Sequence, residues 1–131
     1  MKNKGILNPN ILEAVASLGH TEYLVICDAG LPIPDNIKKI DISLTHGIPT
    51  FDQVLSAIAS ELVIESYIVA AEITEKNPTE FWNIQSTLKE IPHNMVPHED
   101  FKKLTRNAKC IIRTGETKPY ANIIIVGGVN F

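Results

Sequence analysis

The sequence is poor in cysteine and contains no long apolar run. A membrane helix or a secretory signal would need about 18 uncharged apolar residues in succession, so we expect a cytoplasmic protein that does not enter a membrane. The only two cysteines, Cys27 and Cys110, lie in apolar stretches typical of strands, where a free thiol packs as a small hydrophobic side chain. We therefore predict no disulfide bond.

A surplus of positive charge is also missing. The formal net charge is −3 and the sequence pI is ≈ 5.8, which leaves no basic patch for a nucleic-acid backbone. The acidic excess is in turn too small for a disordered acidic tail. This balance excludes nucleic acid as a partner and favours a compact, uncharged ligand.

Motifs for metal and phosphate binding are absent as well. His46, His93 and His98 form no i, i+4 pair and no His-Glu-x-x-His pattern, so a zinc site is not expected. Gly127 and Gly128 stand outside any Gly-x-Gly-x-x-Gly or P-loop pattern, and we interpret them as a bend in the chain.

The apolar pattern predicts alternating helices and strands within a single domain, residues 1–131. With 44% hydrophobic residues the chain can build one core, but 131 residues do not divide comfortably into two domains. Helices are expected to begin at Pro9 after the cap Asn8, at Phe51 (through about Val63), at Pro78 and at Pro97, and strands to span 23–27, 39–42, 64–73, 108–113 and 121–126, with a short segment at 91–96. This order indicates a three-layer α/β/α fold with a largely parallel or mixed central sheet.

His20 directly follows Leu18 and Gly19, and Gly19 is expected to cap the end of the first helix. The macrodipole at a helix C-terminus favours the protonated imidazolium, so His20 is a candidate proton donor near neutral pH. The alternative is an exposed side chain that only helps to end the helix. Position alone leaves both interpretations open.

Asp28 follows the continuous apolar run 23–27, which is typical of a strand buried on both faces. Pro32 and Pro34 make the next segment a rigid loop. Ligands of open α/β sheets bind beyond the carboxyl ends of strands, which is where Asp28 would lie. It is either a binding carboxylate or a residue that only forms the turn.

Three further polar residues, His98, Tyr120 and Asn122, stand at the starts of expected elements. Tyr120 and Asn122 are two positions apart, so within a strand they would face the same side and offer a phenol and an amide to one pocket. His98 follows Pro97 at a helix start and could donate a hydrogen bond to a ligand hydroxyl. The set suits a polyhydroxylated ligand, although each residue could instead serve packing or a turn.

Three segments together resemble the ribose pyranase and fucose mutarotase family: Leu18-Gly19-His20, the Cys-Asp-Ala-Gly-Leu-Pro-Ile-Pro segment from Cys27, and the Pro-Tyr-Ala-Asn-Ile segment from Pro119. The likeness spans nearly the whole chain and is closer to the ribose branch of the family. It implies an isomerase that interconverts the pyranose and furanose forms of D-ribose, and its α and β anomers, without a metal or an organic cofactor.

The resemblance also implies roles for individual residues. His20 would be the catalytic proton donor. The substrate-binding residues would be Asp28, His98, Tyr120, Ala121 and Asn122. Ring opening needs an acid for the ring oxygen and a base for the anomeric hydroxyl, so Asp28 would either orient His20 or bind a hydroxyl. The chain offers no basic clamp for a phosphate group, which favours a free sugar.

The resemblance further implies a cytoplasmic homo-oligomer, a decamer of two five-membered rings with sites completed between neighbouring subunits, and ribokinase as the enzyme that uses the furanose product. The residues themselves do not decide whether Tyr120 and Asn122 meet the His20 of their own chain or of a neighbour. They also leave open a second function, that of a non-catalytic sugar-binding or transport-accessory protein with the same pocket.

Overall fold

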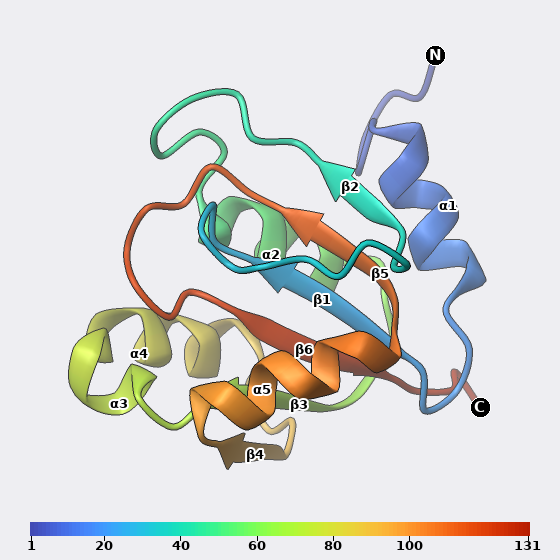
Figure 1. Cartoon of the computed structure of the whole chain (residues 1–131). Coiled ribbons are helices and arrows are strands. Elements are labelled where there is room, and N and C mark those ends of the chain that lie inside the picture. Colours follow the sequence, from blue (N-terminus) through green and yellow to red (C-terminus); the bar gives the residue numbers. More distant parts are fainter.

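The six strands of the protein form one sheet in a computed structural model that describes all 131 residues (Figure 1). The strands are β1 Tyr23–Cys27, β2 Lys39–Asp41, β3 Ile64–Ala70, β4 His93–Val96, β5 Ala108–Arg113 and β6 Ile123–Gly127. Their order across the sheet is β2-β5-β1-β6-β3-β4. β6 runs antiparallel to both of its neighbours, and the other pairs are parallel. The sheet is therefore mixed, one of the two arrangements that the sequence predicts.

β1 and β6 lie at the centre of the sheet and carry continuous apolar runs. The residues from Leu24 to Cys27 and from Ile123 to Ile125 are all fully buried. A strand that is buried on both faces needs apolar side chains at successive positions, which these two segments supply. Asp28 is the first polar residue after β1, so the pattern puts its carboxylate at the end of the sheet.

Helices cover both faces of the sheet. They are α1 Pro9–Ser17, α2 Phe51–Ala59, α3 Ile73–Lys76, α4 Pro78–Thr87 and α5 His98–Leu104, with the 3-10 turn η1 at Thr105–Asn107. Side chains of α1 to α4 join the larger of two apolar clusters, whereas Phe101 of α5 and Leu31 of the loop after β1 join the smaller one. Alternate residues of β1 belong to the two clusters, so the clusters lie on opposite faces, with α5 in front of the sheet in Figure 1. This confirms the predicted three-layer fold.

Local capping sets where α1 and α2 begin. Asn8 Oδ1 accepts hydrogen bonds from the N–H groups of Asn10 and Ile11, at 2.9 and 3.1 Å. Thr50 and Gln53 form a reciprocal capping box at the start of α2. Both starts agree with the prediction. The longest helix, α4, has 10 residues, and no helix combines the length and the hydropathy that a bilayer span requires.

Two predicted helix ends differ from the structure. α1 ends at Ser17, and its C-cap is Leu18 in an extended conformation, so Gly19 does not cap it. α2 ends at Ala59 and does not reach Val63, because the carbonyl of Val63 accepts the Gly128 N–H at 2.9 Å and extends the sheet.

Two predicted strand boundaries are also wrong. The strand expected over 64–73 stops at Ala70, and Ile73 begins α3. Ile73 is fully buried, and hydropathy alone cannot tell a buried helical residue from a buried strand residue. β6 begins at Ile123, two residues later than expected, since Tyr120 has a φ of 57° that interrupts an extended chain.

Candidate functional site

A cavity of about 720 Å³ opens at the carboxyl end of β1. It is lined by residues 28–32, 43–46, His98, 115–120 and Asn122. Four residues selected from the sequence therefore meet in one cavity: Asp28, His98, Tyr120 and Asn122. The carboxyl ends of parallel strands β1 and β5 meet here, which is where α/β folds bind ligands.

Hydrogen bonds hold the Asp28 carboxylate in one orientation. Its Oδ1 accepts the N–H groups of Gly30 and Leu31, at 3.0 and 2.9 Å, and its Oδ2 accepts the Asn122 side-chain N–H at 3.1 Å. Burial raises the pKa of the Asp28 carboxyl above its usual value, and the hydrogen bonds from Gly30, Asn122 and Leu31 oppose that rise. A carboxylate oxygen has two lone pairs, so Oδ2 retains one for a ligand hydroxyl.

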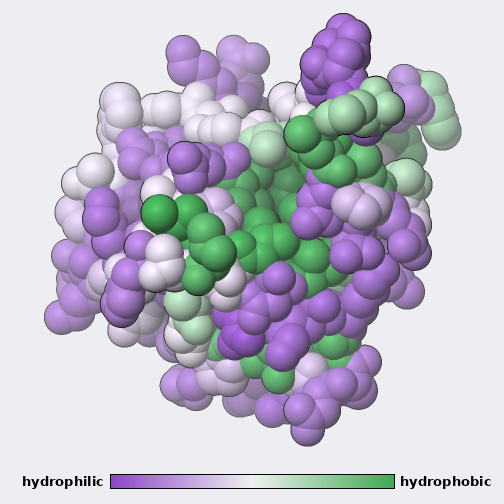
Figure 2. All heavy atoms as spheres, turned by 90° about the horizontal axis from the view of Figure 1, so that it is seen from above, coloured by the Kyte–Doolittle hydropathy of each residue, from purple (hydrophilic) through white to green (hydrophobic).

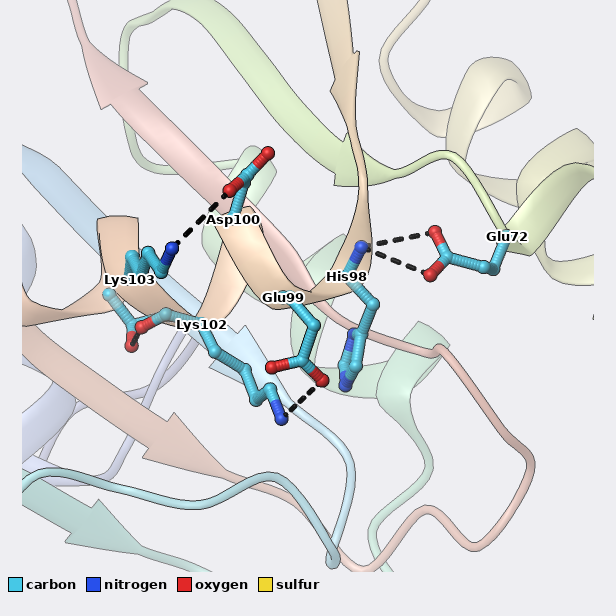
Figure 3. Close-up of polar contacts among 7 residues, drawn as sticks. Glu72, His98, Glu99, Asp100, Lys102 and Lys103 are labelled. Carbon is cyan, nitrogen blue, oxygen red and sulfur yellow. Dashed lines mark hydrogen bonds and ion pairs between the residues drawn. The ribbon is translucent and has the colours of Figure 1, made fainter.

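His98 is the first residue of α5, and its backbone lies against the carboxylate of Glu72. The His98 backbone nitrogen is 3.1 Å from Oε1 and 3.0 Å from Oε2 of Glu72 (Figure 3). A negative charge at a helix N-terminus satisfies an otherwise unpaired donor and complements the helix dipole. An ion pair of 2.8 Å between Glu99 and Lys102 spans the next turn of α5. No sequence motif indicates Glu72. Its carboxylate fixes the start of α5 and thus the position of His98.

The imidazole of His98 packs between two aromatic rings. Its centroid is 5.1 Å from that of Tyr120, with the ring planes at 89°, and 6.4 Å from that of Phe101, with the planes at 10°. The Nδ1 atom of His98 is buried and has no hydrogen-bond partner. An unpaired buried nitrogen costs free energy, so packing alone does not explain a histidine at this position.

Tyr120, Ala121 and Asn122 belong to a turn before β6, so the prediction that the strand begins at Ala121 is wrong. Tyr120 and Asn122 nevertheless both line the cavity, because the Asn122 N–H bonds back to the Tyr120 carbonyl at 2.9 Å and tightens the turn. Ala121 is fully buried in the core and does not line the cavity. The Asn77 side chain donates to the Pro119 carbonyl at 2.8 Å and anchors the turn to α4.

Glu116 shapes the cavity wall although no motif singles it out. The residue is only 6% exposed. Its Oε1 accepts the Phe51 N–H at the start of α2, and its Oε2 accepts the N–H groups of Thr117 and Lys118, at 3.2, 3.2 and 3.4 Å. A buried glutamate in a polar loop has no periodic signature, and only the fold reveals these partners.

Gly115 joins the β5–β6 loop to the loop that precedes α2. Its N–H donates to the Pro49 carbonyl at 2.9 Å, and its carbonyl accepts the Gly47 N–H at 2.7 Å. A Cβ atom at this position would overlap the carbonyl oxygen of Ile48. The glycine therefore lets residues 43–46, including His46, form one wall of the cavity.

His20 lies at the other end of β1, away from this cavity. The extended chain from Tyr23 to Asp28 alone spans about 16 Å, at about 3.3 Å per residue. Of the two roles expected for Asp28, orientation of His20 therefore does not occur within a single chain, and binding of a hydroxyl stays open. His20 borders a separate hollow of about 350 Å³, formed mainly by residues 61–63, which follow α2, and by the C-terminal residues, and its Nε2 is 2.8 Å from Glu65 Oε1.

The structure contains no cluster of side chains that could bind a metal ion. No three His, Cys, Asp or Glu side chains come together as a possible metal site. Cys27 and Cys110 are buried free cysteines, and burial raises the pKa of their thiols to about 12 and about 11. Thiols held in the protonated state are poor nucleophiles and poor metal ligands.

Comparison with known proteins gives a consistent assignment. A D-ribose pyranase of Geobacillus thermodenitrificans strain NG80-2 is 48% identical over 131 residues, which cover 100% of this chain and 99% of that protein. The solved structure of Bacillus subtilis RbsD complexed with D-ribose is 45% identical, with a TM-score of 0.96 and full coverage of both chains.

A solved structure of lower sequence identity shares the same fold. The fucose mutarotase from Streptococcus pneumoniae, solved in complex with L-fucose, has a TM-score of 0.80 over 95% of each chain at 22% identity, which shows the shared fold alone. The model of the RbsD / FucU transport protein family matches residues 1–130. On this match and on the full-length relatives, the chain belongs to the RbsD / FucU family.

Proposed function

We propose that this protein is an isomerase that interconverts the pyranose and furanose forms of free D-ribose, and its α and β anomers. The observation that carries the proposal is the cavity in which Asp28, His98, Tyr120 and Asn122 meet. Its hydrogen-bonding groups match the hydroxyls of a sugar. Full-length relatives named D-ribose pyranase, and a relative solved with D-ribose, support D-ribose as the sugar.

The cavity suits an uncharged sugar better than a sugar phosphate. Phosphate sites usually combine arginine side chains with a nest of backbone N–H groups. One lysine and no arginine line this cavity. In the proposed complex Asp28 Oδ2 accepts a sugar hydroxyl, and the ring of Tyr120 covers an apolar face of the sugar. Ala121 contributes by its place in the turn and not by contact of its side chain.

Ring opening requires two proton transfers. An acid protonates the ring oxygen while a base removes the proton of the anomeric hydroxyl, and ring closure reverses both steps. Each transfer contributes about a hundredfold or more, and because the uncatalysed reaction already occurs in water, no covalent intermediate is needed. The reaction as proposed uses no metal and no organic cofactor.

His20 is the proposed proton donor, and its distance from the cavity of its own chain supports a site that a neighbouring subunit completes. We therefore propose a homo-oligomer in which the His20 of a neighbouring subunit closes each cavity, a decamer of two five-membered rings by family resemblance. The surface supports association: Figure 2 shows an apolar area in the middle of the face seen from above, bordered by hydrophilic side chains. Leu44 and Ile48 are 79% and 52% exposed. Exposed apolar areas are typical of contact sites between proteins.

The proposed setting is the cytoplasm, where ribokinase would use the furanose product. A second function, that of a non-catalytic sugar-binding or transport-accessory protein, would use the same cavity, and membership of a family of transport proteins favours it. The two functions differ in what His20 does. A binding protein has no rate to lose when His20 is replaced, whereas an isomerase keeps its binding and loses its rate.

Saturation-transfer NMR tests the proposal. Exchange between the pyranose and furanose signals of D-ribose is measured without protein, with wild type and with His20→Ala, and then again with L-fucose. We expect faster ribose exchange with wild type and near-background exchange with the variant. Ribose binding without faster exchange would establish the binding function instead, and no response to either sugar would refute both.

A further inference from the structure

The turn that carries His20 is held firmly against the end of the sheet. The Thr21 N–H donates to the Gly127 carbonyl, and the Gly127 N–H donates to the Glu22 carbonyl, both at 2.9 Å. Thr21 has a φ of 68°, an uncommon backbone conformation for a residue with a side chain that persists when the surrounding structure imposes it. The backbone of His20 is thus fixed relative to β6 and to its neighbour β3.

Glu65 meets His20 from an irregular point in β3. The pairing of β3 with β6 shifts register between Ile64 and Ser66, which leaves Glu65 unpaired within the ladder. Such bulges redirect a side chain and are frequent beside active sites. Here the carboxylate reaches across β6, and its Oε1 lies 2.8 Å from the Nε2 of His20.

The other acidic groups near His20 are engaged elsewhere. Glu61 borders the same hollow, but its Oε2 accepts the Ile6 N–H at 2.8 Å. Glu22, in the same turn, pairs with Lys109 at 3.4 Å. The C-terminal residues up to Phe131 line the hollow without bonding the ring. Glu65 is therefore the one carboxylate that bonds the imidazole.

A carboxylate only accepts hydrogen bonds, so the ring nitrogen that faces it must carry a hydrogen. Nε2–H is then committed to Glu65, and Nδ1 is the nitrogen that remains for the reaction. We propose that Glu65 is the positioning residue of the isomerase: it holds His20 through Nε2–H, so that Nδ1 is the atom that gives a proton to the ring oxygen of the sugar and takes one back. This inference rests on the proposed function.

The contact does little for the stability of the fold. The two side chains are 50% and 48% exposed in the single chain, and exposed ion pairs of this kind contribute little to stability. Substitution of Glu65 is therefore expected to leave the protein folded. An effect on catalysis would then reflect the orientation of His20.

The test compares Glu65→Leu, which cannot accept a hydrogen bond, with Glu65→Asp and with the control Glu22→Gln. Glu22→Gln removes a negative charge from the turn that carries His20, but it keeps the Glu65 carboxylate that bonds the imidazole. Turnover and KM for D-ribose come from NMR exchange, and 15N NMR of labelled histidine gives the tautomer of His20. For Glu65→Leu we expect kcat to fall about tenfold with little change in KM, and partial recovery in Glu65→Asp. Glu22→Gln should behave as wild type.

The tautomer measurement separates this inference from the proposed function. Wild type should hold neutral His20 almost wholly as Nε2–H, and Glu65→Leu should return it to the mixture of tautomers found in free histidine. An Nδ1–H tautomer in wild type, or an unchanged kcat in Glu65→Leu, would overturn the role of Glu65. If wild type does not accelerate ribose exchange at all, the proposed function fails, whereas the tautomer still reports whether Glu65 orients His20.

Discussion

Asp28 and Asn122 bond each other twice although 94 positions separate them in the sequence. The Asn122 side chain accepts the Asp28 backbone N–H at 2.9 Å and donates to the Asp28 carboxylate at 3.1 Å. The pair joins the end of β1 to the turn before β6. It fixes the orientation of the carboxylate, and so connects the stability of this end of the sheet to the proposed binding of a ligand.

Replacing Asn122 by alanine should therefore weaken both properties. Asn122 is 1% exposed, and loss of a buried hydrogen-bond partner costs about 1–3 kcal/mol. We expect Asn122→Ala to lower the free energy of unfolding by that amount and to raise the Kd for D-ribose about tenfold or more. Urea unfolding and calorimetric titration measure the two effects. The exposed Asn94 on β4 provides the matched control, since Asn94→Ala should change neither quantity.

The proposed sharing of sites between subunits predicts complementation. His20→Ala should be inactive alone, and Asn122→Ala should be nearly inactive at ribose concentrations well below its raised Kd. When the two are co-expressed and assemble at random, half of the cavities are intact and half of these meet an intact His20, so about a quarter of the sites should regain activity. NMR exchange of D-ribose on the purified mixture measures it. A mixture that stays inactive, although mass spectrometry shows mixed oligomers, would mean that each site uses one chain only.

A buried acidic pair predicts a pH dependence of stability. Glu80 is 3% exposed, and neither its Oε2 nor Asp52 Oδ1 has a hydrogen-bond partner. Burial, and then the neighbouring Asp52, raise the pKa of the Glu80 carboxyl from 4.5 to about 8. The folded state therefore binds this proton more tightly than the unfolded state, and stability falls as pH rises from about 4.5 to about 8.

Glu80→Gln should remove much of this dependence, because an uncharged amide can donate to Asp52 at any pH. Thermal unfolding followed between pH 5 and pH 9 tests it. The variant should lose less Tm than wild type on the alkaline side. Parallel curves for the two proteins would show that Glu80 does not retain its proton in the folded state.

The glycine that joins the two cavity loops predicts a steric effect. A Cβ atom on Gly115 would overlap backbone atoms of Ile48 and Thr45, which cannot move aside as a flexible side chain does. Gly115→Ala should destabilise the protein by roughly 1–3 kcal/mol through overpacking. At Gly30 the nearest atom would lie at 3.7 Å, an ordinary contact. Gly30→Ala is thus the control, and equal unfolding midpoints for the two variants would contradict the prediction.

The sequence alone determined most of the layers and indicated four of the residues that line the cavity. Asn8 and Thr50 cap helices by local hydrogen bonds, and the apolar run 23–27 is typical of a buried strand followed by a polar end, because these features depend on neighbours in the chain. Asp28 at the end of β1 follows from the same pattern. The element boundaries predicted at Gly19, Ile73 and Ala121 were wrong, because at these positions the structure depends on contacts with distant parts of the chain.

Only the tertiary structure decided how the chemical groups are distributed in space. The predicted strand over 23–27 already separates His20 from Asp28, but sequence spacing gives no distance across a sheet, so it could not reveal that residues 43–46 form a wall of the cavity beside Asp28. Nor could it find Glu65, Glu72 and Glu116, since each acts through a partner at least 26 positions away. A carboxylate acquires such a role from the strand order and register that bring it to its partner. Those properties arise from the packing of the whole chain and not from any local segment.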